Sequence, residues 1–115
     1  MAQYLILIYG DEAAWANAGE AAWNEAMQGH MAFGEKNKDA IKGGNALQPT
    51  STATSVRPNG AGTFTVTDGP FVETKEALGG YYVVEAADLD EAVEIAKQIP
   101  ATDGGLEVRP IMVFE

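Results

Sequence analysis

The sequence predicts an α+β domain with a ferredoxin-like sheet and two helices on one face, formed by residues 1–115 as a single domain. Three observations lead to this prediction: an apolar, strand-like start, two segments with helical periodicity, and several β-rich segments separated by turn residues. The predicted order is β-α-β-β-β-α-β, which is the ferredoxin-like plan with an extra strand. A length of 115 residues is that of one ordinary domain.

The first predicted strand, residues 3–9, is apolar on both of its alternating sets of side chains. A strand with one face in water should instead alternate apolar with polar residues. Helices can cover one face, and a second subunit is the simplest cover for the other, so we expect a homodimer. The two sets are Tyr4, Ile6 and Ile8, and Leu5, Leu7 and Tyr9.

A long helix is predicted over residues 19–41, because apolar side chains recur there on one helical face. Gly43-Gly44 is expected to end it, since glycine adopts the left-handed conformation at low cost. The predicted stripe consists of Trp23, Met27, His30, Gly34 and Ile41.

A second helix is predicted from Asp88 onward, where Asp88 and Glu91 have the spacing of a capping box. Pro100 should stop this helix. The last predicted strand covers residues 106–114, and Pro110 within it indicates a sheet edge or a bulge.

Between the helices, a threonine-rich hairpin is predicted with strands at 50–57 and 63–67 and a turn at Asn59-Gly60. The charged segment 72–78 is expected to be a loop, and residues 81–86 the next strand.

Composition excludes several classes of function. The formal charge of −10 disfavours nucleic acid and anionic membrane surfaces, which bind through Lys and Arg. No cysteine and one histidine make a protein-only zinc site implausible, and no nucleotide-binding or serine-hydrolase motif occurs, so no cofactor is expected. The first residues have neither a basic start nor a long apolar run, so we expect a cytoplasmic protein.

Residues 66–82 read VTDGPFVETKEALGGYY, which closely resembles the signature of DGPF-domain proteins, a branch of the YCII-related family. Segments 4–12, 47–49, 53–57, 88–92 and 107–112 also resemble that family. The resemblance implies an α+β barrel that dimerises through its sheet faces. It implies little about chemistry, although some relatives are tied to dehalogenation-type steps and DGPF members are associated with extracytoplasmic-function sigma factors.

The wider family often carries a histidine on its first helix, proposed to act with an aspartate, and His30 resembles that histidine. A histidine there could be a general acid or base near neutral pH, or simply a hydrogen-bonded core residue. No aspartate clearly matches the partner, and we assign Asp68 to that place. Asp68 could equally cap the turn that follows it.

Five further residues are predicted to bind a ligand. Arg57 could clamp a carboxylate or pair with an acidic residue of the chain. Glu73 and Lys75 lie in the charged segment, which is either a solvated loop or the rim of a cavity. Tyr81 could donate a hydrogen bond or pack, and Trp23 could wall the pocket of His30 or fill the core.

The leading hypothesis from the sequence is a cofactor-independent homodimer that binds a small organic molecule, with acid–base chemistry of a lyase or dehalogenase type. A second hypothesis is a non-catalytic interaction or regulatory module, in which His30 is structural. A barrel in the style of the antibiotic monooxygenases, which resemble this plan, is the third. The sequence does not name a substrate.

Overall fold

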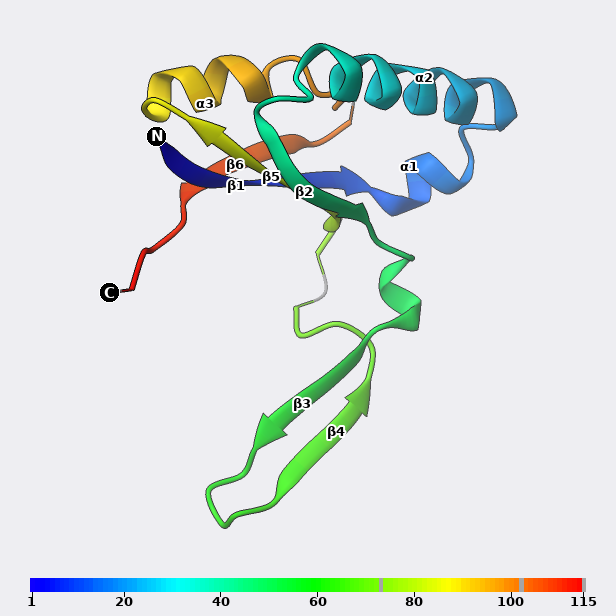
Figure 1. The fold of residues 1–115 in the computed structure, drawn as a ribbon. Helices are drawn as coiled ribbons and strands as arrows, with labels where there is room; N and C mark the ends of the chain where they lie inside the picture. The colour runs from blue at the N-terminus through cyan, green and yellow to red at the C-terminus, as the bar shows by residue number, and fades with distance from the viewer. Residues whose placement is uncertain (73, 102, 115) are drawn as a thin grey trace.

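The computed structural model of the chain describes residues 1–72, 74–101 and 103–114. Its centre is an antiparallel sheet with helices on one face, and a separate two-stranded ribbon leaves the sheet on the other side (Figure 1). The sheet order is β2-β5-β1-β6, which is the ferredoxin-like order once the ribbon strands β3 and β4 are set aside. The predicted fold class is confirmed. The sheet strands are β1 (Ala2–Asp11), β2 (Ile41–Ala46), β5 (Glu76–Ala86) and β6 (Gly105–Pro110).

Two of the helices, α1 and α3, begin where an aspartate side chain accepts backbone N–H groups. Asp11 accepts from two N–H groups of α1 (Glu12–Ala16), and Asp88 accepts from the N–H of Glu91 in α3 (Leu89–Ala96). The Glu91 carboxylate reaches back to the N–H of Ala87, at 3.0 Å, so the predicted capping box is present with its return bond one residue earlier. The long helix α2 (Glu20–Lys36) follows Gly19.

The core lies between the sheet and the helices. Tyr4 and Ile6 of β1 are buried beneath the helices, and Val84 of β5 is fully enclosed beside them. The alternate set of β1 side chains, which includes Leu5 and Leu7, lies on the other face and stays partly exposed. We call this second face the open face of the sheet; cross-strand pairs on it join Leu5 with Val83 and Leu7 with Tyr81.

The predicted helix end was wrong by about one and a half turns. The helix stops at Lys36, where the side chain of Asn37 donates to the carbonyl of Phe33 at 3.1 Å. Gly43-Gly44 lies instead in the edge strand β2, and a Cβ atom on Gly44 would come within 2.8 Å of the Tyr82 ring. Gly44 therefore allows the edge strand to pass close to a large side chain.

The predicted apolar stripe of the long helix was also misplaced. Phe33, which it omitted, is the buried residue of α2, whereas Trp23 and Met27 are 51% and 42% exposed. Ile41 belongs to β2. The stripe is rotated because the helix packs on the sheet mainly through Phe33 and its small neighbours.

The threonine-rich hairpin is confirmed with shifted bounds. Residues Thr50–Thr52 form a short 3-10 turn, and the hairpin strands are β3 (Thr54–Pro58) and β4 (Phe64–Asp68). The loop predicted at 72–78 ends early, since β5 already begins at Glu76. The last strand ends at Pro110, so residues 111–114 lie outside it.

The ribbon β3–β4 projects from the body of the protein, and we call it the arm (Figure 1). The carboxylate of Glu12 fixes the approach to the arm by accepting from the N–H and the hydroxyl of Thr50, at 2.8 and 2.7 Å. The radius of gyration is 16.3 Å. A compact chain of this length would have about 13 Å, so the protomer is extended by its arm.

Candidate functional site

The histidine of α2 is paired with a tyrosine of the sheet. His30 Nδ1 lies 2.8 Å from the Tyr82 hydroxyl, and the two rings stack with centroids 6.0 Å apart. Tyr82 also contacts Phe33 of the same helix, with ring centroids 4.9 Å apart. Tyr82 is therefore held between a helix and the edge strand, and it fixes one nitrogen of the imidazole.

Burial sets the protonation of this pair. Partial burial lowers the pKa of the His30 imidazole, because the charged form loses hydration. Burial likewise raises the pKa of the Tyr82 phenol, which disfavours its anion. At neutral pH both groups are therefore neutral, and one proton lies between Nδ1 and the phenol oxygen.

The structure does not bring His30 and Asp68 together within one protomer. Asp68 is the last residue of β4, opposite Thr54, and it is exposed on the arm. His30 belongs to α2 and contacts Tyr82 on the helix-covered face of the sheet, whereas the arm leaves from the other side (Figure 1). The group beside the imidazole is Tyr82, and the pairing with Asp68 stays a prediction.

Arg57 of β3 lies over an aromatic ring on one face of the arm. Its guanidinium carbon is 3.7 Å from the centroid of the Phe71 ring, within the range of a cation–π contact. A cavity of about 140 Å³ opens beside this pair, and Ser55, Thr67 and Pro70 complete its lining. Stacking leaves the N–H groups at the edge of the guanidinium pointing outward, where they can donate to an anion.

The remaining predicted ligand-binding residues are spread over the protomer. Tyr81 lies on the open face and accepts a 2.8 Å hydrogen bond from Asn45. Lys75 is exposed with its amine 4.0 Å from Asp11, at the start of β5. Trp23 lies against Trp15 on the outside of the helices, and Glu73 lies outside the described residues.

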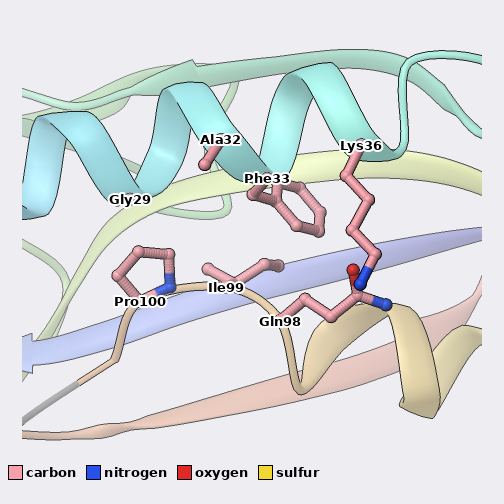
Figure 2. Close-up of a pocket in the computed structure, with 7 residues that line it drawn as sticks. All are labelled: Gly29, Ala32, Phe33, Lys36, Gln98, Ile99 and Pro100. Carbon is pink, nitrogen blue, oxygen red and sulfur yellow. The ribbon is translucent and has the colours of Figure 1, made fainter.

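A groove that sequence reasoning missed runs between α2 and the segment that follows α3 (Figure 2). Its volume is about 380 Å³. Phe33 and Ile99 form its floor, and Lys36 reaches toward Gln98 at one end. The two floor residues are already 3% and 4% exposed, so a ligand would cover little further apolar surface there.

Within the described ranges, no cluster of three or more His, Asp or Glu side chains is placed to hold a metal ion. Across the same residues, no helix has the length and apolar character needed to cross a membrane.

The model of the YCII-related domain family matches residues 2–115 of this chain. The chain is also similar to an uncharacterised protein of Rhizobium meliloti (strain 1021), with 36% identity over 118 residues. That match covers 97% of this chain and 94% of the relative. The relative's name states no activity.

Proposed function

We propose that this chain, which belongs to the YCII-related family, works as a homodimer that binds a small organic molecule and uses His30 as its acid–base group. The observation that carries the proposal is the 2.8 Å contact of His30 Nδ1 with the Tyr82 hydroxyl. It places the single histidine of the chain, partly buried and neutral, next to a fixed partner. The family match bears out the resemblance to the YCII-related family.

The chemistry follows from which atom of the pair holds the proton. If the Tyr82 hydroxyl donates to Nδ1, Nε2 carries hydrogen and can donate to a ligand; if Nδ1 donates, Nε2 is a free base. A neutral imidazole is the form that can abstract a proton, as a lyase or dehalogenase-type step requires. Tyr82 thus acts as a positioning residue for His30 in this proposal.

The homodimer in this proposal is supported by the open face of the sheet. Leu5, Leu7, Tyr81 and Val83 lie side by side there, without helices over them (Figure 1). Antiparallel sheets with one wet face normally place polar side chains on it. Face-to-face pairing of two sheets would remove these four side chains from water.

The proposal also includes residues of the arm that could contact a ligand. Arg57 is the best-prepared of the predicted residues, because its stacking on Phe71 restrains the guanidinium for binding a carboxylate. Asp68 ends β4 opposite Thr54, on the other face of the arm from Arg57, so its part in the site stays a prediction. A ligand with a carboxylate is therefore the first class to test.

The test is an NMR titration of the His30 ring, which is free of overlap because the chain has one histidine. Small carboxylates and halogenated aromatic acids are added to the wild type, to His30→Ala and to Tyr82→Phe. Ligand-dependent shifts of the ring resonances, with affinity or turnover lost in His30→Ala, support the proposal. Silence across the panel, with His30→Ala unchanged in stability, contradicts it.

A non-catalytic interaction module is the second candidate, and the exposed apolar side chains of the arm favour it. The same titration separates the two, because in an interaction module His30 should not respond to small molecules. Sedimentation at micromolar concentration checks the homodimer itself, and a stable monomer would contradict that part.

A further inference from the structure

We propose that the arm of each protomer packs its apolar face against the second subunit of the homodimer. This inference rests on the homodimer proposed above and assigns the arm as an essential part of its interface. The arm consists of β3 (Thr54–Pro58) and β4 (Phe64–Asp68).

The register of the arm sorts its side chains onto two different faces. Directly opposed residues of an antiparallel pair share a face, and successive residues alternate. Val56 pairs with Val66 and Pro58 with Phe64, which makes this face apolar beyond the Thr54–Asp68 pair at its base. The intervening pairs, which make the other face polar, are Ser55 with Thr67 and Arg57 with Thr65.

The apolar face of the arm is left uncovered by the part of the protomer that the structure describes. Val56, Phe64 and Val66 are 54%, 63% and 65% exposed. The polar face is used internally, since Ser55 donates to the carbonyl of Gly69 and Arg57 stacks on Phe71. An isolated two-stranded hairpin is marginal in water unless something packs on it, so the apolar face needs a partner.

The interface area identifies that partner as a second copy of the chain. The four strands of the open face share about six residues each, which gives a footprint of about 20 by 20 Å, or about 400 Å². A stable interface takes about 800 Å² from each partner. The open face alone falls short, and the apolar face of the arm supplies additional surface of the same character.

The direction of the arm fits this arrangement. It leaves from the side of the sheet opposite α2 and α3, which is the side of the open face (Figure 1). Sheets packed face to face lie about 10 Å apart, and a five-residue ribbon is about 17 Å long, so an arm can span the partner's sheet layer. Two-fold symmetry makes the contact reciprocal, since each subunit gives and receives one arm.

The experiment uses single cysteines, which the cysteine-free chain allows without background. Val66→Cys places a thiol on the apolar face, and Thr65→Cys places one on the polar face at the next position. Thiol labelling rates are measured against protein concentration, with sedimentation run on the same samples. We expect the Val66→Cys thiol to be labelled at least tenfold more slowly in the dimer than in the monomer. Dilution, which dissociates the dimer, should restore the fast rate, and the Thr65→Cys thiol should show no such change.

Equal labelling of both thiols in samples that sediment as dimers would overturn the role of the arm and leave the dimer standing. A monomer at every concentration would remove the homodimer and the arm contact together. As a second measurement, Val66→Thr should weaken dimerisation about tenfold, whereas Thr65→Ser should leave it unchanged. Because the arm lies apart from the main sheet, circular dichroism should show both variants folded. Equal dimer affinities of these two folded variants would also overturn the proposal.

Discussion

Replacing Tyr82 with phenylalanine removes the hydroxyl that contacts His30 Nδ1 and keeps the ring that packs on Phe33. A typical hydrogen bond contributes about 0.5–1.5 kcal/mol net, and a fully buried unpaired group costs more. Because His30 is only partly buried, water can reach part of the site, and we expect a loss of about 1 kcal/mol in the free energy of unfolding. For a domain of this length that corresponds to a fall in Tm of about 4 °C.

The assay is urea unfolding at one fixed protein concentration, together with the ¹⁵N shifts of the imidazole, which report its tautomer. Tyr81→Phe is the matched control, because Tyr81 is the adjacent residue, points to the opposite face and also makes one side-chain hydrogen bond. We expect the control within about 0.5 kcal/mol of wild type. If Tyr82→Phe matched the wild type in stability and in imidazole shifts, the paired site would have no physical basis.

Three further predictions concern pH, backbone contact and capping. Because burial lowers the pKa of His30 below 6.5, the contribution of His30 to stability is present above that pH and lost as the pH falls below it. The urea midpoint of the wild type, measured relative to that of His30→Gln, should therefore be level above pH 7 and decline below pH 6.5. A difference that stays level down to pH 5 would contradict this. Gly104→Ala would drive a methyl group into a backbone carbonyl of β1 and should cost at least about 2 kcal/mol, whereas Gly105→Ala meets open space and should stay within about 0.5 kcal/mol in thermal unfolding. Asp88→Ala removes the cap of α3 and should cost about 1 kcal/mol by urea unfolding, while Asp90→Ala, which leaves the cap intact, should cost a few tenths; equal losses would refute the role of the cap.

Local signals in the sequence were sufficient for much of the fold. The cap at Asp88 and the hairpin turn are determined by residues close together in the chain, and both were found where predicted. The end of α2 was misjudged because Gly43-Gly44 resembles a helix stop by its residue type alone. Gly44 instead lets β2 pass close to Tyr82, a contact 38 residues away in the chain that no local pattern reveals.

The candidate site, like the fold, was predicted from sequence only where local pattern decides. Helical periodicity placed His30 facing inward, and any strand puts adjacent residues such as Tyr81 and Tyr82 on opposite faces. Which tyrosine lies under the helix depends on the register of β5 with β1, where Tyr82 pairs with Ile6 on the buried face. The assignment of Asp68 could not be judged from sequence, because it depends on the direction in which the arm leaves the sheet.

The sheet itself separates the two proposals physically. Tyr82 and His30 lie on its helix-covered face, whereas Tyr81 and the arm lie on the side proposed to meet a second subunit. A substitution on the apolar face of the arm, such as Val66→Thr, should therefore change the dimer equilibrium and leave the pH titration of His30 unmoved. Tyr82→Phe should do the reverse. If Val66→Thr also shifted the His30 titration, the imidazole would have to sense the interface through the sheet, and the two faces would form one coupled site.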